Sequence, residues 1–247
     1  MTDLPLGRRQ AAALLILCYA LAALLLASNF TGLYDSLWKP LDIGTFRALN
    51  SSIGADQPLT TFWAWTNSKL FDELTFVVML ALCVYLVFSS RREEWITTAA
   101  KIWCIALLIG VALLISKQIF SDMPHLSPGY ALQPYNDLNE FISGYSVKTA
   151  SENSFPGDHA MTSALFAGGL ILLFRNRPYV IAFSILLMVF VCLPRLAGGG
   201  HWLTDVIIGG GAASLILLPF LKVTPMVALF DRLFRAIWTR MMKLIGR

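Results

Sequence analysis

Charged residues are scarce in this chain. They make up 14% of its 247 residues, whereas 57% are hydrophobic, and the mean hydropathy is +0.66. Soluble globular domains usually carry about 25% charged residues. The scarcity therefore excludes an ordinary water-soluble protein and predicts a protein embedded in a membrane.

Six stretches are apolar enough to enter the hydrocarbon layer, which takes about 20 residues of helix to cross. They are residues 11–28, 74–88, 102–120, 161–174, 180–196 and 203–221. The connections between them leave no room for a separate soluble domain. We predict an all-α polytopic fold in which six transmembrane helices form one catalytic domain, residues 1–221.

The first stretch has an alternative interpretation as a cleaved signal peptide. Arg8 and Arg9 precede it, and the small residues Ala27 and Ser28 close it. Its apolar run is longer than the hydrophobic region of the usual signal peptide. Cleavage would also leave an odd number of spans with a conflicting charge pattern. We therefore expect a retained first span.

Lysine and arginine cluster next to alternate ends of the predicted spans, which places the clusters on one side of the membrane. Because positive loops stay inside, we predict that this side and both termini are cytoplasmic. The formal net charge of +4 arises from these clusters, so we expect anionic membrane lipids as partners and no nucleic acid. The clusters are Arg8 and Arg9, Arg91 and Arg92, Arg175 and Arg177, and Lys222, Arg232, Arg235, Arg240 and Lys243.

The last 26 residues, 222–247, differ from the spans because they mix apolar and basic side chains. Phe230, Phe234, Ile237 and Met241 recur at helical spacing between the arginines. This pattern predicts a basic amphipathic helix at the cytoplasmic membrane surface. A partly frayed tail is the alternative.

Cysteine is also rare, and its positions exclude a disulfide framework. The chain has four cysteines, and all lie inside predicted spans rather than in loops. We expect buried free thiols and no metal site. The four are Cys18, Cys83, Cys104 and Cys192.

Only three histidines occur, and all map to the outer membrane edge: His125, His159 and His201. A zinc site built from them is not expected, because their spacing does not match that of a catalytic zinc site. We therefore expect neither a metal nor another cofactor. His125, in the long outer loop of residues 121–158, also reads as an ordinary loop residue.

The densest polar pattern joins Arg195, His201 and Asp205. If a helix begins near His201, Asp205 lies one turn further along the same face and can hold the imidazole in one tautomer. The other ring nitrogen is then free as a nucleophile toward phosphorus, with Arg195 as a cation for the phosphoryl oxygens. The preceding glycines, including Gly200, offer backbone amides to an anion. A satisfied structural ion pair is the alternative.

Two further elements point to the same edge. Gly157 and Asp158 precede His159 at the start of the fourth span, where His159 is placed to act as a general acid. Lys117 lies near the outer end of the third span, where an ammonium group needs an anionic partner such as a phosphate. The plain alternatives are a capping Asp158, a packed His159 and a Lys117 that extends to the interface.

These residues resemble the type 2 phosphatidic acid phosphatase superfamily, whose pattern is Lys-x6-Arg-Pro, Pro-Ser-Gly-His and Ser-Arg-x5-His-x3-Asp. Arg195, His201 and Asp205 match the third motif, with Pro194 in place of serine. Lys117 matches the start of the first motif. The resemblance implies a nucleophilic histidine, His201, and catalysis without metal.

The departures from the pattern are local. In the second motif Pro156 and His159 are kept, while Gly157 and Asp158 replace serine and glycine. The arginine and proline of the first motif are replaced by Pro124 and His125, so His125 is the remaining candidate to stand in for that arginine.

These departures, and the stretches 38–42 and 66–68 of this chain, resemble the lipid A 1-diphosphate synthases. That resemblance implies a bacterial inner-membrane phosphotransferase that moves the terminal phosphate of undecaprenyl pyrophosphate to the 1-phosphate of lipid A at the periplasmic face. Lys117, Arg195, Gly157, Asp158 and Gly200 are then expected around the phosphate. A lipid phosphatase with water as acceptor, and a transporter, are the competing functions.

Overall fold

The computed structural model describes residues 6–120, 123–244 and 246. Ser121 and Asp122, with which the predicted outer loop begins, lie outside the described residues, as do residues 245 and 247 of the tail. The described part of the chain is helical and contains no β-strand. The predicted all-α class is therefore confirmed.

The described chain contains long and short α-helices, and four short π-helical or 3-10 segments lie between some of them. The turns are two π-helical segments, Tyr34–Trp38 and Asp205–Gly210, and two 3-10 segments, Arg92–Glu94 and Leu138–Glu140. The α-helices are α1 (Arg8–Asn29), α2 (Lys39–Asn50), α3 (Thr60–Thr66), α4 (Lys69–Phe88), α5 (Trp95–Phe120), α6 (Pro128–Ala131), α7 (Asp158–Leu173), α8 (Pro178–Ala197), α9 (Gly211–Leu217), α10 (Phe220–Val223) and α11 (Met226–Leu244).

Five helical segments of the described chain are long and apolar enough to cross a membrane. They contain α1, α4, α5, α8 and the stretch Asp205–Val223. The predicted fourth span corresponds to α7, which has only 16 residues. Such a helix is about 24 Å long, shorter than the hydrocarbon layer of about 30 Å.

Two predicted boundaries need correction. The second span begins at Lys69 rather than at residue 74, because Ser68 caps the helix by accepting from the amide of Phe71. The sixth span is not one continuous helix. It runs through the π-helical segment and α9 and is interrupted at Pro219, which has no amide hydrogen to donate.

Helix α7 forms the centre of the bundle and contacts α5, α8, α9 and the segment Asp205–Gly210. Two glycines allow this close approach. A Cβ atom on Gly168 would lie 2.4 Å from Leu218, and one on Gly169 would lie 2.7 Å from Ile105. The core around α7 is apolar and well enclosed, with Leu165 and Leu170 fully buried.

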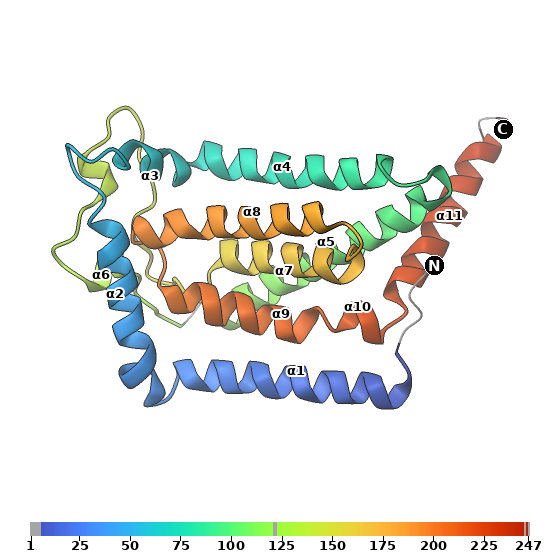
Figure 1. Ribbon diagram of the computed structural model, residues 1–247, viewed down its shortest axis with the longest axis horizontal. Helices are drawn as coiled ribbons and strands as arrows, with labels where there is room; N and C mark the ends of the chain where they lie inside the picture. Colours follow the sequence, from blue (N-terminus) through green and yellow to red (C-terminus); the bar gives the residue numbers. More distant parts are fainter. Residues whose placement is uncertain (1–5, 121–122, 245, 247) are drawn as a thin grey trace.

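The two ends of the bundle differ. Helix α2 runs across one end, where α3 and α6 also lie (Figure 1). The start of α1 and the whole of α11 lie at the opposite end (Figure 1). The chain termini are therefore on the same side of the bundle, away from α2.

The predicted amphipathic tail is helical as α11 and is docked on α5. Trp103 of α5 contacts the rings of Phe230 and Phe234, at centroid distances of 6.4 and 6.3 Å. Asp231 accepts a hydrogen bond from Thr97 Oγ1 at 2.6 Å. These contacts disagree with a frayed tail over Met226–Leu244.

Candidate active site

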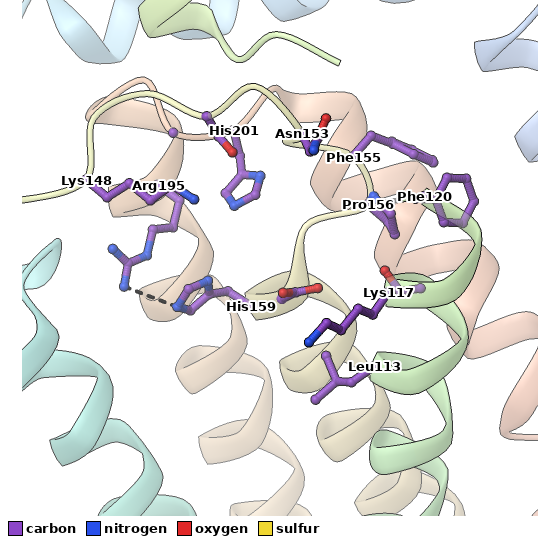
Figure 2. Close-up of a pocket in the computed structure, with 14 residues that line it drawn as sticks. Leu113, Lys117, Phe120, Lys148, Asn153, Phe155, Pro156, His159, Arg195 and His201 are labelled. Atoms are coloured by element: carbon purple, nitrogen blue, oxygen red, sulfur yellow. Dashed lines mark hydrogen bonds between the residues drawn. The ribbon is translucent and has the colours of Figure 1, made fainter. Parts of the chain in front are cut away.

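A cavity of about 520 Å³ opens at the α2 end of the bundle, between α5, α7, α8 and the outer loop. Most of the sequence-predicted site residues line it (Figure 2). Gly157, Asp205 and His125 do not line it. The predicted residues along its wall are Lys117, Asp158, His159, Arg195, Gly200 and His201.

His201 projects into this cavity and is held by two oxygen atoms (Figure 2). Its Nδ1 lies 2.9 Å from the carbonyl oxygen of Ser154 and 3.3 Å from Oδ2 of Asp205. Because a carbonyl oxygen can only accept, Nδ1 carries the hydrogen. In the neutral ring, Nε2 then has the lone pair that a nucleophile needs.

Asp205 lies behind His201 and is fully buried. Its Oδ2 also accepts from the amide of Trp202 at 2.9 Å, which fixes the carboxylate at the start of the helix. On its other side, Nδ1 of His125 lies 3.6 Å from Oδ1. The sequence did not predict this position: Nδ1 of His125 lies within hydrogen-bond distance of Oγ of Ser154, at 2.9 Å, and His125 lies outside the cavity.

Asp42 of α2 binds the residue before Asp205, at the same helix start. Its fully buried carboxylate accepts from the amide of Thr204 at 2.9 Å and from the Thr204 hydroxyl at 2.8 Å. Burial raises the pKa of Asp42, and the hydrogen bonds from Thr204 oppose this rise. Burial next to Asp42 raises the pKa of Tyr34 to about 12. No role was assigned to residues 38–42 from the sequence. The structure shows that Asp42 of this stretch positions Thr204 and thereby its neighbour Asp205.

Both terminal nitrogens of Arg195 are held by α4 and the turn before it. Its Nη2 pairs with the carboxylate of Asp72, and its Nη1 donates to the backbone and side-chain oxygens of Asn67, both at 3.2 Å. Asn67 also donates to the carbonyl oxygen of Pro194 at 2.8 Å. The stretch 66–68 thus sets the position of Arg195.

Asp72 is the residue of this site that sequence reasoning missed. Its Oδ1 lies 3.2 Å from Nε2 of His159, so it contacts both the arginine and the histidine. Nη2 of Arg195 also lies 3.2 Å from that histidine nitrogen (Figure 2). The only sequence signal for Asp72 was an acidic residue just before an apolar run. Acidic residues are common in the first turn of any helix, so this signal did not point to the site.

The glycine turn after α8 does not supply free amides, contrary to the prediction for Gly200. The amides of Gly200 and His201 both donate to the carbonyl oxygen of Arg195, at 3.0 and 3.2 Å. The amide of Gly157 likewise donates to the carbonyl of Asp205 at 3.3 Å. The carbonyl of Arg195 lies in the last turn of α8, where carbonyl groups lack a partner within the helix, so the amides of Gly200 and His201 satisfy it.

The turn serves instead to bring the outer loop close. Gly199 has φ +86°, and a Cβ atom there would lie 3.0 Å from the carbonyl oxygen of Thr149. Gly129 donates its amide to Gly199 at 3.0 Å. A residue with a side chain at Gly199 would be strained and would push the loop away from the cavity.

Helix α7 begins at the cavity, with Asp158 and His159 in its first turn. Gly157 is its N-cap, so the interpretation of Asp158 as the cap is wrong, and no side chain caps this end. A helix of 16 residues with an open N-terminus directs amide hydrogens and a partial positive charge into the cavity. Among the two helix ends at the site, this one rather than the glycine turn has amide hydrogens directed to the cavity.

Lys117 lies in the last turn of α5 and lines the cavity. Within the described part of the chain, no carboxylate lies within 4.0 Å of its ammonium group. The four cysteines are free, as predicted. Among the described residues, no three His, Cys, Asp or Glu side chains form a metal-binding group.

Comparison with known proteins gives the family. Residues 129–229, which include His159, Arg195, His201 and Asp205, match the model of the PAP2 superfamily. The chain contains a PAP2 superfamily domain. It is an enzyme of this superfamily, and a membrane protein.

The PAP2 domain has a curated relative of known name. The chain is 29% identical over 201 residues to lipid A 1-diphosphate synthase of Escherichia coli strain K12, an alignment that covers 79% of this chain and 82% of the relative. A structural neighbour is the first transmembrane PAP2-type phosphatidylglycerolphosphate phosphatase from Bacillus subtilis. That match has a TM-score of 0.49 and 21% identity, and it covers 88% of this chain and 96% of the other.

Proposed function

We propose that this enzyme transfers the terminal phosphate of undecaprenyl pyrophosphate to the 1-phosphate of lipid A, through a phosphohistidine on His201. The observation that carries the chemistry is the position of His201 Nδ1 between Ser154 O and Asp205, which leaves Nε2 available. The substrates are carried over from the resemblance to lipid A 1-diphosphate synthases, over 79% of the chain.

In the first step, Nε2 of His201 attacks the distal phosphorus and the bond from that phosphorus to the bridging oxygen breaks. The proton held at Nε2 of His159, which faces Asp72 at 3.2 Å, passes to the bridging oxygen. Undecaprenyl phosphate leaves. The centroids of the two imidazole rings are 6.5 Å apart, so one phosphoryl group between them has both within reach.

The developing negative charge is met by fixed positive groups around the cavity. We assign this role to Lys117, Arg195 and the open N-terminus of α7. Phosphoryl transfer depends mainly on positioning and on such charge stabilisation. No step in this scheme calls for a metal.

In the second step, the phosphoryl group moves from Nε2 of His201 to an oxygen of the lipid A 1-phosphate and the phosphorus–nitrogen bond breaks. His159 takes a proton from the acceptor, so both histidines are restored. Asp158 lines the cavity and is exposed at the start of α7. A carboxylate there repels a bound phosphate unless it contacts something else. We assign it to the acceptor side of the site.

We place the enzyme in the bacterial inner membrane, with α7 as a sixth membrane-inserted helix and the cavity facing the periplasm. The basic residues Arg8, Arg9, Arg91 and Arg177 flank helix ends far from the cavity, which supports a cytoplasmic location for that end. Residues 1–221 form the catalytic domain in this proposal. Residues 222–247 form a basic tail whose helix α11 rests on anionic headgroups.

The test uses purified protein and undecaprenyl pyrophosphate labelled on its terminal phosphate, with and without lipid A. Label on lipid A is the expected result. Label released only as inorganic phosphate would assign the enzyme to the lipid phosphatases with water as acceptor. A His201→Ala protein that still moved label would remove the proposed nucleophile.

A further inference from the structure

The cavity holds a third cation that the motifs do not include. Lys148, from the outer loop, lines the cavity together with Lys117 and Arg195. Figure 2 shows Lys148 beside Arg195 and His201, with Lys117 across the cavity from them. The positive charge is therefore distributed over two sides of the cavity.

Arg195 cannot by itself offset the charge of a diphosphate. Its Nη2 is paired with Asp72 and its Nη1 is bound to two oxygens of Asn67. Lys117 and Lys148 differ from it, because no carboxylate within the described residues lies within 4.0 Å of either ammonium group. A buried or half-buried anion in this cavity gains most from these two lysines.

The backbone next to Lys148 is held in place by its contacts with the rest of the protein. Val147 and Thr149 on either side are buried, whereas Lys148 is exposed, which is the alternation of an extended segment. Asn139 accepts from the amide of Val147 at 2.9 Å and donates to its carbonyl at 3.1 Å. The carbonyl oxygen of Thr149 packs close to Gly199, where a Cβ atom would lie 3.0 Å from it. The direction of the Lys148 side chain is thus set by the backbone around it.

We propose that Lys148 binds the second phosphate of a lipid diphosphate and so makes the site selective for diphosphates over monophosphates. This inference rests on the proposed function in one respect, namely that the distal phosphate sits at His201 between Lys117 and the start of α7. The proximal phosphate of the same ester then lies toward the loop, where Lys148 is the unpaired cation. A monophosphate occupies only the first position and does not reach Lys148.

The experiment measures binding without turnover. Thermal unfolding of the purified protein in detergent is followed with increasing inorganic pyrophosphate and, separately, orthophosphate. We expect Lys148→Ala to weaken pyrophosphate binding about tenfold and orthophosphate binding by less than about threefold. Lys148→Arg should restore most of the pyrophosphate affinity because it restores the charge.

Lys69→Ala is the matched control, since Lys69 is an exposed lysine at the start of α4 that does not line the cavity. Equal weakening of both anions, or an equal effect of Lys69→Ala, would overturn the inference. A loss of pyrophosphate selectivity in Lys148→Ala supports it even if the labelled lipid assay shows no transfer to lipid A. Transfer to lipid A with unchanged selectivity refutes it while leaving the proposed function intact.

Discussion

Nε2 of His159 lies 3.2 Å from Oδ1 of Asp72, a residue 87 positions earlier in the chain. The two histidines that line the cavity therefore each face an aspartate behind its wall, because Nδ1 of His201 lies 3.3 Å from Oδ2 of Asp205. In the proposed mechanism, the first aspartate positions the proton donor and the second positions the nucleophile.

The first prediction concerns Asp72. Replacing Asp72 with Asn keeps the size of the side chain but removes the negative charge that faces Nε2 of His159 and offsets Arg195. We expect kcat to fall about 100-fold, with a changed pH dependence of kcat measured on the lipid diphosphate. Glu73→Gln is the matched control, since Glu73 is the exposed neighbour on α4. Equal activity of the two variants would contradict a role for Asp72 in proton transfer.

The second prediction concerns the covalent intermediate on His201. Rapid quenching in alkali during turnover of labelled donor should trap label on the wild-type protein, because a phosphorus–nitrogen bond on imidazole survives alkali and breaks in acid. His201→Ala should trap none and should lose activity by several orders of magnitude. Trapped label in His201→Ala would show that another residue is the nucleophile.

The third prediction concerns the buried carboxylate of Asp42 and pH. The pKa of Asp42 is raised in the folded protein, so its contribution to stability is largest when the group is protonated, below the ordinary aspartate value of about 3.9. That contribution is lost as the pH rises through the raised pKa. The thermal stability of the wild type relative to Asp42→Asn should therefore decrease from mildly acidic to neutral pH. Asp35→Asn, at an exposed site, should show no such trend.

The fourth prediction concerns the docking of α11. Phe230 contacts Trp103 and the core, whereas Leu233 of the same helix is 50% exposed. Phe230→Ala should lower the free energy of unfolding by about 1 kcal/mol, because part of a large apolar side chain becomes exposed. Leu233→Ala should change it less. Equal thermal unfolding of both variants in detergent would argue that α11 is only loosely attached.

The sequence was informative where the contacts are local. His201 and Asp205 are four residues apart, so their contact is local, although His201 lies just before the helix, which begins at Leu203. The role of Asp72 was not predictable, because it depends on how α4 packs against α7 and α8. The contact of Asp42 with Thr204 joins residues 162 positions apart and was hidden for the same reason.

One sequence argument failed for a physical reason. The glycines before His201 were expected to offer free amides, but a helix that ends there has carbonyl groups that need donors. The carbonyl of Arg195 accepts from the amide of Gly200 and from that of His201. The helix start at Asp158, which was treated mainly as the position of His159, is the better donor of amide hydrogens.

The enclosure of α7 has a consequence for the enzyme in different membranes. Helix α7 is in contact with other helices, whereas α1 and α4 have almost their whole length exposed on the outside of the bundle. A thicker or thinner bilayer therefore acts first on α1 and α4, which can tilt to match it. The helix that carries His159 is shielded from that adjustment, so the spacing between His159 and His201 is insulated from the thickness of the lipid around the protein.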